Sequence, residues 1–167
     1  MAGAEHEDRS SDLILRDAQL VRLVGGKTVA QVSAGELHYQ RQGGEFHASR
    51  VHARLLPGPQ ARALESFGAV EVVAPEVAGD RSQTRAVGLV SVSAARGDTA
   101  RGADVLWDGE RRLLSSEKPV SIAGSGYTLS GGSLEATTDG ERFELGHGAS
   151  GTVSHAPTLA QAKGGAR

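Results

Sequence analysis

The sequence contains no cysteine and no asparagine. Without cysteine, the chain has no disulfide bond, no thiolate nucleophile and no cysteine-based zinc or iron–sulfur site. Without asparagine, it has no acceptor for N-glycosylation. The missing cysteines leave the compartment open, because proteins without disulfides exist on either side of a membrane.

Long apolar runs and a strong net charge are also missing. No run approaches the roughly 18 apolar residues of a membrane span, and the opening MAGAEHEDRSSD lacks the apolar core of a signal peptide. We therefore expect a soluble chain, either complete or the soluble part of a longer protein. The formal charge is −2, the pI is near 6.3 and the arginines are scattered. We expect no nucleic-acid partner, because no segment carries a basic patch.

Aromatic residues make up only 4% of the chain, with a single tryptophan, Trp107. A closed, densely packed sandwich of this size usually carries more aromatic side chains in its core. Valine, leucine and alanine dominate instead, and such a lining suits a groove for an extended apolar ligand. The alternative is an ordinary aliphatic core in a chain of biased composition, which composition alone favours.

Short alternating segments are the dominant pattern in the sequence. Apolar and polar residues alternate over four to eight positions between Gly and Asp breaks, which is typical of half-buried strands. Helical periodicity is confined to Gly58–Phe67, after Pro57. We expect strands near Leu13–Leu23, Thr28–Tyr39, Glu45–Leu56, Val70–Val77, Thr84–Ala94, Asp98–Trp107, Arg112–Ile122, Tyr127–Thr137, Arg142–Gly148 and Gly151–Ser154.

Tight turns fit at four pairs of residues, Gly25-Gly26, Gly43-Gly44, Asp108-Gly109 and Asp139-Gly140. The Asp-Gly pairs are the strongest, because a type I′ hairpin turn needs positive φ at both central residues.

A weak internal repeat runs through the strands. The segments AGELHYQRQGGEFHASRVHARL, RGADVLWDGERRLLSSEKPVSIA and GGSLEATTDGERFELGHGASGTV each place a glycine, a strand, a polar turn, a strand and then a break. Repeats of this size indicate stacked hairpins with a continuous core. We expect flexible segments at 1–12 and 155–167 around one β domain at 13–154.

No motif for catalysis stands out. The only G-x-G-x-x-G is GHGASG, Gly146–Gly151, and it lacks the following helix and acidic residue of a dinucleotide site. We interpret it as a strand corner or bulge. No G-x-S-x-G motif is present, so we predict no catalytic residues, no enzyme activity and no cofactor. A dispersed site is the alternative.

Three histidines form the one cluster of potential metal ligands. If Leu37 and Phe46 point inward, alternation places His38, His47 and His52 together on the outer face of neighbouring strands. Three imidazoles on one face can bind zinc or copper. Solvated polar residues are the more frequent outcome, so we predict no metal site.

The stretch SSEKPVSIAGSGYTLSGGSLEATTDGERFEL resembles the C-terminal part of periplasmic lipopolysaccharide-export proteins of the LptC type. The similarity is carried by the order of Pro119-Val120, Ile122, Gly124, Gly132 and Leu134. Upstream blocks continue it, at Gly88, Val90, Val92, Val105 and Trp107, and at Val32, Ala34, Leu37 and Tyr39. It covers about Leu13 to Val153 and extends to the LptA/OstA-like superfamily.

The resemblance implies an all-β fold, an open twisted β-jellyroll of many short antiparallel strands. It implies a periplasmic role at the inner membrane: lipopolysaccharide is received from an ABC transporter and passed to another jellyroll joined by edge-strand addition. The candidate edges are Leu13–Leu23 and Glu141–Val153. The lipid-binding residues it implies are Tyr39, Val72, Val90, Val92, Val105, Trp107, Val120, Ile122, Leu129 and Leu134.

Two departures from the family leave alternatives open. The N-terminal membrane anchor usual in the family is not in this sequence, so the expected tether lies outside it, or the protein is a soluble LptA-like bridge. The stretch Leu55–Phe67 also looks longer and more helical than the family's turn. A structural β module that binds partners by its edges without carrying lipid is the competing function.

Overall fold

The computed structural model describes residues 12–59, 61–138 and 142–154. One short 3-10 helix, Arg62–Leu64, lies within the expected helical stretch. The strands are β1 (Leu13–Val24), β2 (Lys27–Tyr39), β3 (Phe46–Leu55), β4 (Val70–Gly79), β5 (Gln83–Ala94), β6 (Thr99–Asp108), β7 (Leu113–Ser116), β8 (Val120–Gly124), β9 (Tyr127–Gly131), β10 (Ser133–Thr137), β11 (Phe143–Gly146) and β12 (Ser150–Val153).

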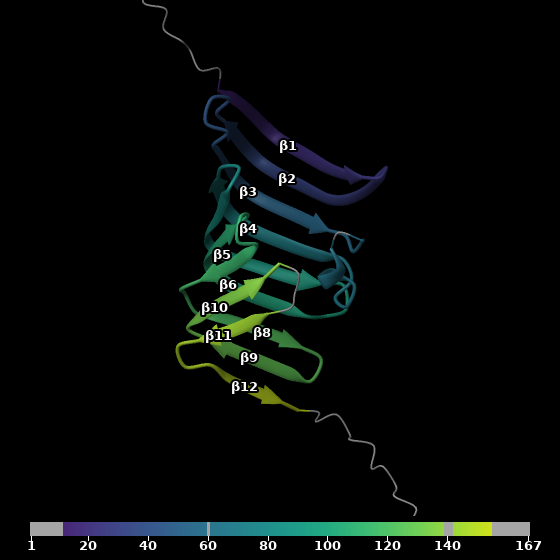
Figure 1. The fold of residues 1–167 in the computed structure, drawn as a ribbon, viewed down its shortest axis with the longest axis vertical. Coiled ribbons are helices and arrows are strands. Elements are labelled where there is room, and N and C mark those ends of the chain that lie inside the picture. The colour runs from purple at the N-terminus through teal and green to yellow at the C-terminus, as the bar shows by residue number, and fades with distance from the viewer. Residues whose placement is uncertain (1–11, 60, 139–141, 155–167) are drawn as a thin grey trace, which may run out of the picture.

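The strands form one open, twisted antiparallel sheet (Figure 1). Each strand from β1 to β7 pairs with the next along the chain, and β10 and β11 continue beyond β7. Strand β6 also pairs with β8, β8 pairs with β9, and β9 pairs with β12. The sheet therefore forks at β6. The predicted all-β fold, an open twisted β-jellyroll of antiparallel strands, is confirmed.

Local predictions had mixed outcomes. The turn at Gly25-Gly26 is present, and the turn at Asp139-Gly140 lies outside the described residues. Two predicted strands were wrong, because 112–122 splits into β7 and β8 and 127–137 splits into β9 and β10. The predicted flexible ends fall almost wholly on residues 1–11 and 155–167, which are also outside the described residues. The division into a 13–154 domain and flexible ends stays a prediction. No helix in the described part of the chain is long and apolar enough to cross a membrane.

A line of backbone irregularities, here called the crease, crosses the whole sheet. In each pairing from β1 to β6 the run of paired residues is interrupted at the same level. The interruptions fall at Asp17, Gly35, Arg50, Pro75, Gly88 and Asp104. Farther along, the gaps between β7 and β8, between β9 and β10, and between β11 and β12 continue the line. The gaps between β4 and β5 and between β5 and β6 include a register shift, as a β-bulge does, whereas β1–β2, β2–β3 and β3–β4 keep the same register on both sides of the gap. Bulges and other local irregularities bend a strand, so their alignment bends the sheet along one line.

Left-handed backbone conformations mark the crease. Asp17, Arg50 and Asp104 have φ near +50°, and Gly88 has φ of 81°. Asp104 Oδ1 accepts a 3.0 Å hydrogen bond from the Gly88 amide, which fastens β6 to β5 at this level. At Gly35 the Arg50 side chain occupies the space that a Cβ would fill. A larger residue at position 35 would displace the end of the Arg50 side chain from this place.

The predicted repeat follows the crease. Its copies start beside Gly35, Gly102 and Gly132, run through the hairpins β2–β3, β6–β7 and β10–β11, and return to the crease. The GHGASG motif is such a return, since His147 (φ 54°) and Gly148 (φ 85°) separate β11 from β12. The interpretation of this motif as a strand corner is confirmed. One repeat is thus one hairpin with a bend at each end.

The crease divides the sheet into two wings. Wing A comprises residues 13–16, 36–39, 46–49, 76–79, 83–87 and 105–108 with β7, β10 and β11. Wing B comprises residues 18–24, 27–34, 51–55, 70–74, 89–94 and 99–103 with β8, β9 and β12. Leu37 of wing A and Val32 of wing B pack against the same buried cluster of Ala18, Ala34, Ala48 and Val51. The wings therefore share one apolar face, the inner face.

Most of the buried core lies along the crease, apart from Val70 at the outer end of wing B, and it consists of small side chains. Directly paired buried positions are Ala18 with Ala34, and Val51 with Ala74; Val90 faces Gly102, and Val120 faces Gly131. The buried polar residue Ser116 donates a 2.7 Å hydrogen bond to the Ala103 carbonyl and accepts one from the Lys118 amide. Small side chains allow the two wings to approach, because bulkier ones would hold them apart.

Enlarging a crease residue should destabilise the protein. We expect Ala74→Leu to lower the free energy of unfolding by about 1–3 kcal/mol, because Ala74 is only 2% exposed. Ala78→Leu, on the outer face of the same strand, should change it by less than about 0.5 kcal/mol. Urea denaturation measures both. Equal losses in the two variants would contradict a crease that depends on small residues.

Candidate functional site

The inner face carries continuous lines of apolar residues outside the crease. Residues directly opposite in register point to the same face. One line crosses the strands of wing A on the side farthest from the crease, and it is here called the rim line. It contains Leu13, Tyr39, Phe46, Gly79, Thr84, Trp107, Leu114, Ala136 and Phe143. The middle line of wing A contains Leu15, Leu37, Ala48, Val77, Ala86 and Val105, with Leu134 and Leu145 on the far strands. The line of wing B contains Leu20, Val32, Ala53, Val72, Val92, Ala100, Ile122, Leu129 and Gly151.

The structure brings all ten predicted lipid-binding residues to this one face. Tyr39 and Trp107 belong to the rim line, and Val105 and Leu134 belong to the middle line. Val90 and Val120 lie at the crease, where they are 5% and 4% exposed. The other four, Val72, Val92, Ile122 and Leu129, belong to the line of wing B. Their contact with lipid stays a prediction.

Most of the inner face is incompletely buried. Among the described residues, the buried hydrophobic side chains are all alanine or valine, and no leucine, isoleucine or aromatic side chain is buried. The larger apolar residues of the inner face are half-buried or exposed; Leu20 is 50% exposed and Trp107 is 37% exposed. The sheet therefore presents apolar surface that its own chain does not cover.

Aromatic residues gather on the rim line. Tyr39, Phe46, Trp107 and Phe143 are four of the six aromatic residues in the chain. The outermost, Phe143, is 51% exposed. The other two lines of the inner face carry aliphatic side chains. The inner face therefore carries aromatic side chains on the rim line and aliphatic side chains closer to the crease.

Sequence reasoning missed part of this face. Phe46, Leu114 and Phe143 were not among the expected lipid-binding residues, although they lie in the same line as Tyr39 and Trp107. The signal for Phe46 was available, because it pairs with Tyr39 across the turn at 40–45, where Gln40 and Glu45 share a backbone hydrogen bond. The same kind of signal was available for the other two, because Leu114 pairs with Trp107 in the hairpin β6–β7 and Phe143 pairs with Ala136 in the hairpin β10–β11.

The three predicted histidines lie on the outer face, and His38 directly opposes His47. Each has a different glutamate beside it. His38 Nε2 is 2.6 Å from Glu36, His47 Nε2 is 3.6 Å from Glu76, and His52 Nε2 is 3.7 Å from Glu71. Within the described part of the chain, no three His, Cys, Asp or Glu side chains are arranged to hold a metal ion. The histidines therefore make separate pairs with carboxylates.

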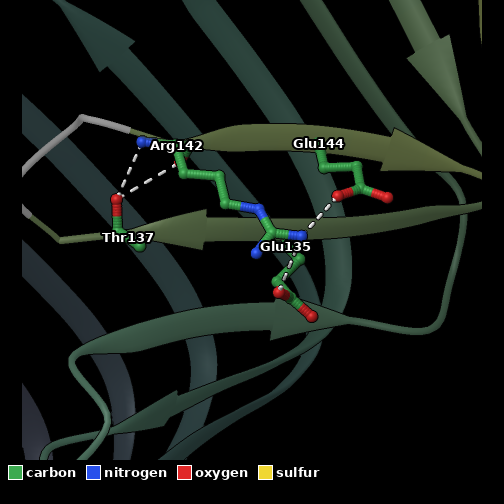
Figure 2. Close-up of polar contacts among 4 residues, drawn as sticks. All are labelled: Glu135, Thr137, Arg142 and Glu144. Atoms are coloured by element: carbon green, nitrogen blue, oxygen red, sulfur yellow. Dashed lines mark hydrogen bonds and ion pairs between the residues drawn. The ribbon is translucent and has the colours of Figure 1, made fainter.

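An arginine bridges two opposed carboxylates near the edge of wing A (Figure 2). Glu135 of β10 and Glu144 of β11 are direct cross-strand partners, which is unfavourable for like charges. Arg142 is 2.7 Å from Glu144 and 3.8 Å from Glu135. Its amide also donates a 2.9 Å hydrogen bond to Thr137 Oγ1. Arg142 thus keeps this last hairpin together.

The sheet has free edges at both ends. Strand β1 pairs with β2, β11 pairs with β10, and β12 pairs with β9, and each has one paired neighbour within the described residues. Figure 1 places β1 at one end of the long axis and β12 at the other. The edge β1 also exposes Ile14, Val21 and Leu23. Both edges were predicted as sites of strand addition, and that role stays a prediction.

No family model matches the chain, and no curated protein matches its sequence. In structure, the chain is similar to LptH, the LptA-homologous periplasmic component of the conserved lipopolysaccharide transport device from Pseudomonas aeruginosa. The likeness covers 83% of this chain and 84% of LptH, with 12% sequence identity and a TM-score of 0.30. At these values it does not assign the chain to a family, so function has to be inferred from the chain's own residues.

The hydrogen bond between His38 and Glu36 has a measurable consequence. It is the largest cause that lowers the pKa of Glu36 below 4.5, and Arg16 and Arg50 add smaller effects. We expect the His38→Ala variant, which has no side-chain donor, to raise the pKa of Glu36 toward 4.5, as followed by NMR of the side-chain carboxyl. Because the folded-state pKa is depressed, the associated stability is present above the unfolded-state pKa and is lost as the pH falls through the folded-state pKa. An unchanged Glu36 titration in the variant would contradict the assignment.

Proposed function

We propose that this protein is a periplasmic lipopolysaccharide carrier. The lipid's acyl chains lie against the inner face, and the chain passes them between an inner-membrane ABC transporter and a second jellyroll of the same kind. The observation that carries this proposal is the apolar inner face. It gathers all ten residues that the family resemblance implied, and eight of those ten are not buried.

The character of the inner face suits transfer of lipid as well as binding. Covering apolar surface contributes about 0.8 kcal/mol for each methylene removed from water. Two lines of alanine, valine, leucine and isoleucine offer many similar, shallow contacts to an acyl chain. No deep aromatic pocket interrupts them, so a bound chain can move along the face without breaking one dominant contact.

The rim line gives the bound lipid an orientation. Tyrosine and tryptophan combine an apolar ring with a polar group, and they are favoured where an apolar region meets water. We place the acyl chains over the aliphatic lines near the crease and the polar head of the lipid beyond Tyr39 and Trp107. Lipopolysaccharide fits this arrangement because it joins several acyl chains to a large polar head.

The free edges are the proposed docking sites for partners. An edge strand presents unpaired backbone N–H and C=O groups that can accept a strand from another protein. Strand β1 would meet one partner, and β11 or β12 would meet the other, so lines of apolar residues could continue from one protein to the next. We favour an LptC-like role, tethered to the inner membrane through an anchor outside this sequence. An LptA-like soluble bridge is the second form of the same function.

We propose no catalytic step for this protein. Most of its candidate site is made of hydrocarbon side chains, and Tyr39 and Thr84 of the rim line contribute the hydroxyl groups. The three histidines described above lie on the outer face, where each has a glutamate partner. Carriage without chemistry is what the composition of the inner face supports.

A charge on the inner face should abolish binding. We expect Val105→Asp to reduce co-elution of the protein with labelled lipopolysaccharide on a sizing column by at least about tenfold, because a carboxylate would be desolvated by the acyl chains. Leu106→Asp is the matched control, since Leu106 is the next residue of β6, is equally half-buried and faces outward. It should bind like the unmodified protein. Thermal melts verify that both variants are folded.

Two results would overturn the proposal. If the unmodified protein elutes without lipopolysaccharide, direct carriage is wrong and the competing scaffold function, which binds partners by edge strands, takes its place. If Val105→Asp and Leu106→Asp lose binding equally, the lipid does not lie on the inner face. Co-elution of phospholipid to the same extent would show a carrier for acyl chains in general.

A further inference from the structure

The outer face of wing B is hollowed where β5, β6, β8, β9 and β12 lie next to one another. The hollow has a volume of about 570 Å³. Two lines of residues in register cross it on the outer face. The first line contains Ser91, Arg101, Ser121, Ser130 and Ser150, and the second contains Ser93, Thr99, Ala123, Thr128 and Thr152. Eleven of the sixteen lining residues belong to the outer face, and the other five, Val92, Ala100, Ile122, Leu129 and Gly151, lie between the two lines and belong to the inner-face line of wing B.

Residues with hydroxyl groups make up half of the lining. Eight of the sixteen residues that line the hollow are serine or threonine. Each hydroxyl can donate one hydrogen bond and accept others, so the array can satisfy a ligand that is itself rich in hydroxyl groups. Ser130 and Ser150 already bond to each other at 2.9 Å, which fixes two of the hydroxyls across β9 and β12.

Arg101 is the single charged residue in the lining, and the lining contains no carboxylate. Its side chain has no ion pair or hydrogen bond among the described residues, whereas Arg16 and Arg142 on the outer face of wing A both have carboxylate partners. Arg101 lies between Ser91 and Ser121 in the first line. A cation without a counter-charge, surrounded by neutral hydroxyl groups, favours an anionic ligand.

We propose that this hollow binds a phosphorylated saccharide. The guanidinium of Arg101 presents parallel N–H donors that match the oxygens of a phosphate group. The serine and threonine hydroxyls of β8, β9 and β12 bond the sugar hydroxyls, and the volume accommodates one or two sugar rings. The assignment does not depend on lipid carriage by the inner face.

The test is an NMR titration of the full chain with glucose 1-phosphate, with glucose and inorganic phosphate as separate arms. We expect glucose 1-phosphate to shift the amide signals of Arg101, Ser121 and Ser130. Glucose and phosphate alone should bind more weakly, because each lacks half of the contacts. No shift with glucose 1-phosphate would overturn the proposal. Equal affinity for inorganic phosphate would reduce the site to a simple anion site and overturn the saccharide assignment.

Variants separate the two kinds of contact. Arg101→Gln should weaken glucose 1-phosphate binding by about tenfold or more, since it removes a charged hydrogen bond. Arg54→Gln is the matched control: it removes an arginine from the outer face of wing B outside the hollow, and it should change the affinity by less than about twofold. The double variant Ser121→Ala, Ser130→Ala should weaken glucose 1-phosphate and leave inorganic phosphate unaffected. Unchanged binding in both Arg101→Gln and the double variant would place the ligand elsewhere.

Discussion

The crease is the constraint on which the rest of the structure depends. A long antiparallel sheet can fold across its strands only if neighbouring strands bend at the same level. Here left-handed conformations at Asp17, Arg50, Gly88 and Asp104 provide that bend, and because these positions lie at the same level across the strands, the local bends form one line. The small buried residues beside it, such as Ala34 and Ala74, let the wings meet. The faces on the two sides of the crease then share one apolar interior.

The same constraint explains why the interior stays open. The buried hydrophobic side chains are alanine and valine, and most of them lie at or beside the crease, with Val70 at the far end of wing B as an exception. The larger apolar residues, Leu20 and Trp107 among them, therefore remain partly in water. A soluble protein rarely leaves so much continuous apolar surface without a use for it. An extended apolar ligand lying along the lines of the inner face would cover it, and a closed core would have no room for one.

The alternation of apolar and polar residues along the strands was sufficient to predict which face of the sheet most residues occupy. Val105 and Trp107 are two positions apart on one strand, and so are Val90 and Val92. Residues two apart on a strand point to the same face, so once one residue of a pair was assigned to the inner face, the other followed. The bends were harder to predict. Gly132 and the segment 117–119 each split a predicted strand, because a bend depends on the register of neighbouring strands. Nothing in an arginine indicates a positive φ, so Arg50 gave no local signal. The hollow around Arg101 depends on six strands from distant parts of the chain, and alternation fixes only which face each residue occupies.

The most direct test of the central claim uses the single tryptophan. Trp107 lies on the rim line of the inner face, and its fluorescence is quenched when a brominated acyl chain touches it. The account predicts that a brominated fatty acid quenches the unmodified protein. It also predicts that the Trp107→Phe, Leu106→Trp double variant, with its tryptophan moved to the outer face, is quenched far less. No quenching of Trp107, or equal quenching of the two proteins, would contradict lipid binding on the inner face.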